Sequence, residues 1–405
     1  MVAMKNIIFH IDVNNAFLSW TAVDLLEQGY KYDIRNSYAV VGGDETKRRG
    51  IVLAKSNSAK KMGIVTGETL YSARKKCRVL KVYSPNYPFY QKKSNELFTL
   101  LSKYTNDIEP FSIDECFLDY TKIKHQYGNE ILFAHKLKNQ IQKELGFTVN
   151  IGIGNNKLCA KMASDFLKPN RVHTLYDEEV ESKMYPLPIE DLFGIGKKTA
   201  PKLRKLGIQT IGDLAYYPEQ KLILYFKNQA IKMKEAAMGI DHSIIQKKKE
   251  TRESISNSTT LEKDYTDKVE IYKILELISE NVARALRKQN KYAYTVSVQL
   301  KDCYFKSRQH QKKMMNPTNL TDVIFEVSKS LVDEMWDEIP IRLVGIRLDN
   351  LTLENNRQVS LFDDIKLENK NVELEKTLDE LKDKFGNSII RKASSSNHKI
   401  NKKYL

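Results

Sequence analysis

The chain has 405 residues, of which 41% are hydrophobic and 29% are charged, and its formal net charge is +15 at pH 7. This length predicts two to four domains with apolar cores of their own. We expect no membrane-spanning helix, because no window of about 18 apolar residues occurs. The start of the chain also lacks the pattern of a signal peptide, which predicts a cytoplasmic protein with no membrane partner.

The excess of positive charge points to a polyanionic partner, since each Lys or Arg near a phosphate releases condensed counterions. A membrane surface or an acidic protein would also fit this charge. The four cysteines stand far apart with no paired spacing, which argues against a zinc site and a disulfide framework; they are Cys77, Cys116, Cys159 and Cys303.

Strands and helices alternate over the first 172 residues, which predicts an α+β domain. We expect strands at 7–12, 37–42, 50–54 and 148–153, a hairpin of two strands at 108–119, and helices at 16–28, 57–62, 90–104, 131–145 and 157–167. From about His173 the pattern becomes all-helical, with a glycine-containing hairpin between two helices.

The stretch 246–260 is basic and rich in Ser and Thr, which predicts a linker. A further domain follows, with helices at 268–289 and 320–336 and strands at 292–300, 303–311 and 341–351. This order predicts a small sheet with helices on one face. From Asn355 the composition turns polar and predicts a tail, in which Leu374 to Phe385 have the spacing of one amphipathic helix.

Three carboxylates stand where they would be costly without a cation. Asp12 ends an apolar strand, and Asp114 and Glu115 lie at the tip of the predicted hairpin. Magnesium accepts hard oxygen ligands of this kind together with substrate phosphates. Taken singly, Asp12 is also a common helix cap, and Asp114-Glu115 a common polar turn.

The segments around these acids, 10–17 and 112–119, resemble the two metal-binding motifs of the Y-family DNA polymerases, the DinB/UmuC class of bacteria. The resemblance runs from Lys5 to about Leu353. It implies an α+β, multidomain right-hand polymerase: a palm with a mixed sheet, small fingers, an all-helical thumb with a helix-hairpin-helix, and an α+β little finger. The implied limits are 1–19 and 86–172 for the palm, 20–85 for the fingers, 173–241 for the thumb, 242–253 for a linker, 254–353 for the little finger and 354–405 for the tail.

The resemblance implies low-fidelity, template-directed DNA synthesis from deoxynucleoside triphosphates opposite damaged or undamaged bases, by a nucleoid-associated enzyme. Asp12, Asp114, Glu115 and the Val13 carbonyl are then expected to hold two Mg²⁺ ions. Two ions about 3.5–4 Å apart can activate a primer 3′ hydroxyl and stabilise the leaving pyrophosphate.

Further residues around the nucleotide carry over from the family. Phe17 matches the steric gate that excludes a ribose 2′ hydroxyl, and Asn57, Lys60 and Lys168 match positions that grip the triphosphate. The sequence departs from the family here, since many relatives carry Tyr in place of Asn57 and Arg in place of Lys60. Ala16, beside the gate, is smaller than the usual aromatic residue.

Two segments are expected to hold primer-template DNA. Gly194 and Gly196 resemble a helix-hairpin-helix, in which glycines let the backbone approach a phosphate. The basic stretch 284–313 is expected to present one sheet face to DNA. The predicted DNA-contacting side chains are Lys197, Lys198, Lys306, Arg308, Lys312 and Lys313.

In the tail, residues 358–362 resemble the peptide by which bacterial polymerases dock on the sliding clamp; they are Gln358, Val359, Ser360, Leu361 and Phe362. Two other readings of the chain stay open. A catalytically silent DNA-binding scaffold would not need the intact acidic set. A metal-dependent nuclease is not favoured, because the sequence shows no His-rich or Lys-paired active site and a nuclease would leave Phe17 unexplained.

Overall fold

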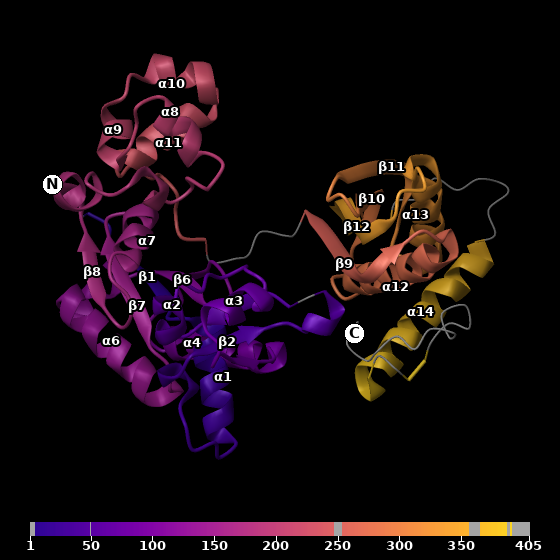
Figure 1. The fold of residues 1–405 in the computed structure, drawn as a ribbon, viewed down its shortest axis with the longest axis horizontal. Coiled ribbons are helices and arrows are strands. Elements are labelled where there is room, and N and C mark those ends of the chain that lie inside the picture. Colours follow the sequence, from indigo (N-terminus) through magenta and orange to yellow (C-terminus); the bar gives the residue numbers. More distant parts are fainter. Residues whose placement is uncertain (1–4, 49, 247–252, 356–364, 387–388, 391–405) are drawn as a thin grey trace. The chain divides into compact units, whose positions relative to one another are not determined.

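The chain divides into two compact units, Met1–Glu45 with Gly50–Lys249, and Thr46–Arg49 with Glu250–Leu405 (Figure 1). The computed structural model describes residues 5–48, 50–246, 253–355, 365–386 and 389–390. Within these residues, each helix is too short or too polar to cross a membrane.

A five-stranded sheet forms the centre of the first unit, in the strand order β5-β6-β1-β7-β8. Its strands are β1 (Ile8–Val13), β5 (Ile108–Pro110), β6 (Glu115–Asp119), β7 (Val149–Gly154) and β8 (Val172–Leu175). β1 pairs antiparallel with both β6 and β7, whereas β7 pairs parallel with β8. The sheet is therefore mixed, as predicted, and β1 lies in its middle.

The two faces of this sheet are covered differently. Successive residues of β1 point to opposite faces, and Phe9, Ile11 and Val13 enter the main apolar core. The helices that contribute to this core are α1 (Ala16–Glu27), α4 (Tyr87–Ser102) and α6 (Glu130–Leu145). The other face packs against α7 (Lys157–Asp165). A Cβ on Gly152 of β7 would lie 2.0 Å from the Ala160 carbonyl oxygen of α7, so a glycine is needed for this close approach.

The rest of the first unit contains a small sheet and a helical region. The small sheet has the order β3-β2-β4. Its elements are β2 (Ala39–Gly42), β3 (Val52–Lys55) and β4 (Lys81–Tyr83), with α2 (Asn57–Lys61) and α3 (Leu70–Lys76). The helical region consists of α8 (Ala200–Lys205), α9 (Ile211–Tyr216), α10 (Glu219–Phe226) and α11 (Gln229–Ala237). A separate short helix, α5 (Lys124–Tyr127), precedes α6 in the chain. The segment predicted to be all-helical from about His173 contains the four helices α8 to α11, but the prediction is wrong at its start, because Val172–Leu175 form β8 of the central sheet. α3, α5 and β4 lie where no element was predicted.

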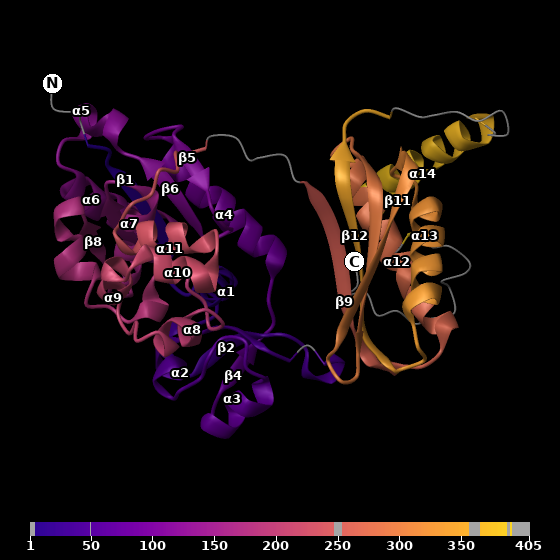
Figure 2. The ribbon, with the colours of Figure 1, turned by 90° about the horizontal axis from the view of Figure 1, so that it is seen from above.

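The second unit is a four-stranded antiparallel sheet with helices on one face (Figure 2). Its elements are β9 (Ser254–Tyr265), β10 (Tyr292–Asp302), β11 (Ser307–Thr318) and β12 (Ile341–Thr352), with α12 (Lys268–Arg287) and α13 (Thr321–Met335). The predicted architecture of this domain is confirmed. The linker predicted from composition at 246–260 is wrong from Ser254 onwards, because β9 is an edge strand whose Ser and Thr side chains resemble a linker in composition; the linker implied by the family, 242–253, ends just before β9.

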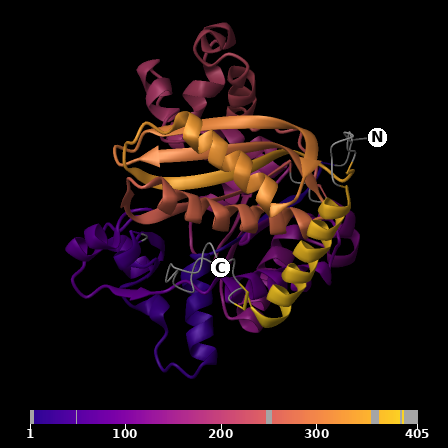
Figure 3. The ribbon, with the colours of Figure 1, turned by 90° about the vertical axis from the view of Figure 1, so that its right-hand side faces the viewer.

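The polar tail does contain the predicted helix, α14 (Ile365–Phe385), but this helix is not detached. Arg287 of α12, whose side chain is 7% exposed, forms ion pairs with Glu375 and Asp379 of α14. Glu375 also accepts hydrogen bonds from the backbone N–H and the hydroxyl of Thr321, at the start of α13. α14 is thus packed onto the helical side of the second unit (Figure 3). The predicted clamp-binding residues, 358–362, lie outside the described residues.

Candidate active site

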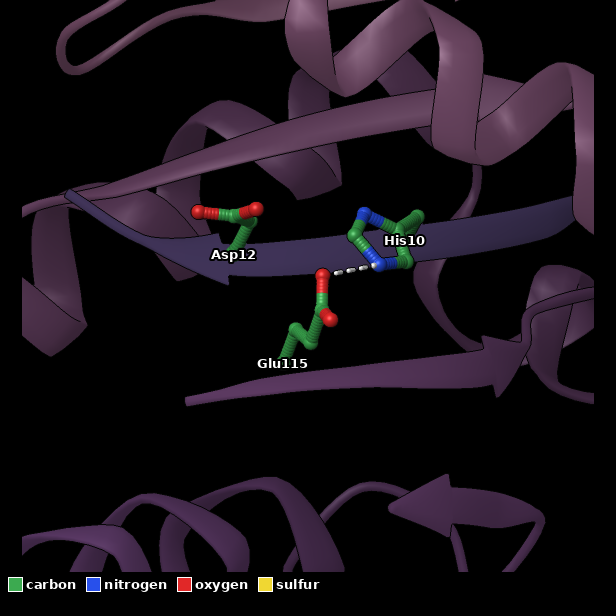
Figure 4. Close-up of side chains that lie close together, drawn as sticks. All are labelled: His10, Asp12 and Glu115. Atoms are coloured by element: carbon green, nitrogen blue, oxygen red, sulfur yellow. Dashed lines mark ion pairs between the residues drawn. The ribbon is translucent and has the colours of Figure 1, made fainter. Parts of the chain in front are cut away.

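The acidic residues predicted on β1 and β6 meet in the central sheet. Asp12 lies opposite Glu115 in the β1–β6 pairing and opposite Asn150 in the β1–β7 pairing. Figure 4 shows that Asp12, Glu115 and His10 point toward one another. Ligand atoms of these three residues all lie within 4.8 Å of one another, and His10 Nε2 is 3.3 Å from Glu115 Oε2. The register of two strand pairs therefore builds the site.

Two lysines bring positive charge to these carboxylates. Lys161 Nζ, on α7, lies 2.6 Å from Glu115 Oε2 and 3.4 Å from Asp12 Oδ2. Lys168 Nζ lies 3.1 Å from Asp12 Oδ2 and 2.8 Å from Asp165 Oδ1. Because grouped carboxylates need positive charge to stay ionised together, a cluster that attracts two ammonium groups also suits divalent cations.

The pKa values of the ionisable groups at the site are shifted by their burial and by their close neighbours. Burial alone would raise the pKa of Glu115, but hydrogen bonds from His10 and Lys161 and the Lys161 charge outweigh it and hold that pKa at about 2. Burial would lower the pKa of Lys161, yet its hydrogen bond to Glu115 and the nearby carboxylates raise it. Burial lowers the pKa of His10. The site thus contains an ionised carboxylate beside a protonated lysine.

Asp114 lies next to this group. Its backbone oxygen accepts a hydrogen bond from the Val13 N–H at 3.0 Å, which holds the hairpin tip against the end of β1. Its carboxylate accepts a hydrogen bond from the Ser112 hydroxyl at 2.5 Å and does not belong to the 4.8 Å group. Burial, with the charges of Asp12 and Glu115, raises the pKa of Asp114. Metal binding by Asp114 and by the Val13 carbonyl stays a prediction.

Phe17 lies in the first turn of α1, five residues after Asp12. Its ring stacks on the buried ring of Tyr90, with centroids 4.8 Å apart and planes inclined by 13°. The Tyr90 hydroxyl is in turn 2.6 Å from Thr21 Oγ1, so the stack is anchored at its far end. The ring of Phe17 is therefore held in place by packing, and its role as a steric gate stays a prediction.

The two predicted triphosphate residues on α2 are exposed. Asn57 begins this helix, and its Oδ1 accepts a hydrogen bond of 3.4 Å from Asn15, three residues after Asp12. Lys60 lies one turn further along α2. Burial lowers the pKa of Lys55, and the nearby charge of Lys60 lowers it further. Asn57 thus lies near the acidic site, and the triphosphate role of both residues stays a prediction.

The glycine hairpin in the helical region has an open backbone. Gly194 has φ +94°, a conformation that favours glycine, and an added Cβ at Gly194 or Gly196 would meet nothing within 4 Å. Ile195 between them is buried in the helical core and fixes the hairpin. Lys197 and Lys198 are exposed. The surface can therefore be approached closely by a ligand backbone.

In the second unit the predicted basic residues do not all share one sheet face. Val296 points into the core and lies opposite Lys312, whereas Thr295 lies opposite Lys313. By strand alternation, Lys313 is on the face without helices, and Lys312 is on the helix side. Arg308 is also on the helix side, where it forms an ion pair with Asp337, and Lys306 lies in the turn before β11. Two cations of the open face that were not predicted are Lys301 and Arg347.

Sequence reasoning also missed polar residues of the active site itself; they are His10, Asn14, Asn150 and Lys161. One signal was available for Lys161. Gly152 and Gly154 alternate in β7, and glycines at this spacing indicate that a helix packs directly on the strand. The helix that follows carries Lys161 on the side that faces the acids.

The fold of this chain is that of the Y-family DNA polymerases. A solved structure, a Y-family DNA polymerase chimera, is similar to it with a TM-score of 0.74 and 25% sequence identity, over 86% of this chain and 100% of the other. Three family models match: the impB/mucB/samB family at residues 11–165, the IMS family HHH motif at 177–208, and the impB/mucB/samB family C-terminal domain at 252–361.

Curated relatives match over almost the whole length. DNA polymerase IV of Clostridium acetobutylicum is 45% identical over 390 residues, which are 96% of this chain and 98% of the relative. DNA polymerase IV of Clostridium kluyveri is 34% identical, with 96% and 98% covered. The chain therefore belongs to the impB/mucB/samB family, the DinB-type branch of the Y-family DNA polymerases.

Proposed function

We propose that the chain is a translesion DNA polymerase that extends a primer 3′ end with deoxynucleotides and uses two Mg²⁺ ions. Membership of the family supports DNA-directed synthesis, DNA binding and the use of divalent metal. The observation that supports the metal site in this chain is the pair Asp12 and Glu115, with two lysine ammonium groups against their carboxylates.

The residues present fit divalent cations. Asp12 and Glu115 offer hard oxygen ligands, and the Asp114 carboxylate, outside their 4.8 Å group, is still close enough for their charges to raise its pKa, after burial. When bound, two ions supply a lowered pKa for the primer hydroxyl and charge neutralisation for the pyrophosphate. Asp12 and Glu115 lie opposite each other on the paired strands β1 and β6, and Lys161 donates a hydrogen bond that helps to keep Glu115 ionised.

The incoming triphosphate is expected near Lys168 and Lys60. Lysine binds phosphate as a point charge and needs no planar geometry. Lys168 lies beside Asp12, so its ammonium would be placed to bind a triphosphate held at this site. The ring of Phe17 would pack under the sugar and collide with a 2′ hydroxyl.

The template and primer would lie against the glycine hairpin at 194–196 and the open face of the second unit's sheet. Contacts of this kind bind phosphates and carry no sequence information, which suits an enzyme that accepts any template. Docking to a sliding clamp through residues 358–362 also belongs to this proposal. It rests on the peptide's sequence alone.

Primer extension on matched templates, one undamaged and one with a single lesion, tests this function. We expect Mg²⁺-dependent extension on both and bypass of the lesion. Asp12→Ala and Glu115→Ala should abolish extension while DNA binding, measured by fluorescence anisotropy, persists. Extension near the wild-type rate by either variant would show that these residues are not the metal ligands.

A further inference from the structure

A buried polar network connects the strand that carries Asp12 to the turn that carries Lys168. Asn14 follows Asp12 by two residues, and Asn150 lies opposite Asp12 on β7. Their exposed fractions are only 5% and 0%. Buried amides are costly unless their hydrogen bonds are made, so the partners of this pair indicate what the pair does.

Asn150 uses its full hydrogen-bonding capacity, which is two donors and two acceptor sites. Its Oδ1 accepts from Asn14 Nδ2 and from the Arg171 backbone N–H, both at 3.1 Å. Its Nδ2 donates to the backbone oxygens of Ser164 at 3.0 Å and Leu167 at 2.7 Å. These partners also determine the orientation of the amide, because a flip would direct its NH₂ group at the Arg171 N–H.

Asn14, which follows β1, binds the same turn, residues 167–171, from the side of β1. Its Oδ1 accepts from the Asn170 backbone N–H at 2.9 Å and from the Thr148 hydroxyl at 3.0 Å. The backbone is therefore held on both sides of Lys168, at Leu167 before it and at Asn170 after it. Lys168 Nζ then lies 3.1 Å from Asp12 Oδ2.

We infer that Asn14 and Asn150 are positioning residues that set the place of the Lys168 ammonium relative to Asp12, and thereby the affinity for the nucleotide triphosphate. This inference rests on the proposed triphosphate role of Lys168. Neither amide touches the substrate in this scheme; both act through the backbone of residues 167–171. The strand that supplies a metal ligand and the turn that supplies a phosphate ligand are thus one hydrogen-bonded unit.

Single-nucleotide incorporation at saturating primer-template tests the inference. Asn14→Ala removes the acceptor of the partly buried Asn170 N–H. We expect KM for the deoxynucleotide to rise by about tenfold or more, which equals a loss of about 1.4 kcal/mol, with a smaller change in kcat. Asn14→Asp keeps that acceptor but places an oxygen against Asn150 Oδ1, so its KM should lie between those of the wild type and Asn14→Ala. Asn150→Ala should raise KM at least as much as Asn14→Ala.

The matched control is Asn129→Ala, which removes another asparagine with two backbone partners, the N-cap of α6, away from the site. It should lower the melting temperature and leave KM unchanged. If Asn14→Ala and Asn150→Ala behave like this control, the network only stabilises the fold and the inference is wrong. If the alanine variants do not fold, Asn14→Asp carries the same comparison.

A second measurement distinguishes the positioning role of Asn14 and Asn150 from the proposed triphosphate role of Lys168. Lys168→Ala alone should raise the nucleotide KM, and adding Asn14→Ala to it should raise KM little further, because the positioned group is already gone. If Lys168→Ala leaves KM unchanged, the triphosphate role of Lys168 fails. If Lys168→Ala raises KM but the two effects multiply, only the positioning role fails.

Discussion

Lys161 Nζ lies 2.6 Å from Glu115 Oε2, so a lysine of α7 is the direct neighbour of a proposed metal ligand. Both side chains are largely buried, at 12% and 16% exposed. In the metal-free protein this ammonium offsets the repulsion among the grouped carboxylates. Removing it should therefore make the fold depend more strongly on added cation.

We expect Lys161→Met to lower the unfolding free energy of the metal-free protein by roughly 1–3 kcal/mol, because it leaves Glu115 without its closest partner. Saturating Mg²⁺ should then stabilise the variant more than the wild type, since the ion replaces the missing charge and no ammonium competes with it. Thermal denaturation with and without Mg²⁺ measures both effects.

The control for this experiment is one turn earlier on the same helix. Lys157 forms an ion pair with Glu109 at 2.8 Å, with 14% and 16% exposure, away from Asp12. Lys157→Met should also lose stability, but its gain from Mg²⁺ should equal that of the wild type. Equal gains in all three proteins would contradict the proposed neutralising role of Lys161.

The low pKa of Glu115 predicts a pH dependence of stability. Folding lowers this pKa from 4.5 to about 2, so the ionised carboxylate stabilises the fold above pH about 4.5, and this contribution is lost as the pH falls toward 2. The loss is on the order of 3 kcal/mol. Urea denaturation of the metal-free protein across this range should show a shallower decline for Glu115→Gln. Identical slopes would mean that the carboxylate gains no net stabilisation from its partners.

The stacked ring of Phe17 predicts how the enzyme rejects ribonucleotides. Phe17→Ala should raise the efficiency of ribonucleotide incorporation relative to deoxynucleotide by about tenfold or more, the scale for one removed steric clash in a pocket. Tyr90→Phe is the control, because it keeps the stacked ring and removes only the hydroxyl group that meets Thr21. An unchanged ratio in Phe17→Ala would make the ring a packing residue.

The two faces of the second unit's sheet give a matched test of DNA binding. Neutralising Lys313 or Arg347, on the open face, should reduce the slope of log affinity against log salt by about one for each phosphate that the protein no longer neutralises. Neutralising Lys312, the neighbour of Lys313 on the helix side, should leave the slope nearly unchanged. If the two lysines have the same effect, DNA does not bind to the open face.

The positions of Asp12 and Glu115 followed from the sequence because each depends on local pattern. An apolar strand that ends in an acid and a hairpin with acids at its tip are short-range features, and antiparallel pairing brings them opposite each other. Lys161 depends instead on how closely α7 packs on β7, which the absence of a side chain at Gly152 permits. Packing between segments of this kind is hard to predict from a single sequence, because no local pattern specifies it.

Two other errors have different physical causes. β9 resembles a linker because an edge strand with one open face can be rich in Ser and Thr and still pair along its length. Lys312 and Lys313 could not be assigned to faces without the strand register, since a shift of one residue exchanges the two sides. The register here includes an irregularity between Ala293 and Thr295.

The ion pairs that attach α14 to α12 have a topological consequence for the residues before it. β12 ends at Thr352 and α14 begins at Ile365, so the connecting residues start and finish on the same domain. High salt would weaken the ion pairs of Arg284, Arg287 and Lys288 with α14, so the attachment of this helix to the second unit should depend on ionic strength.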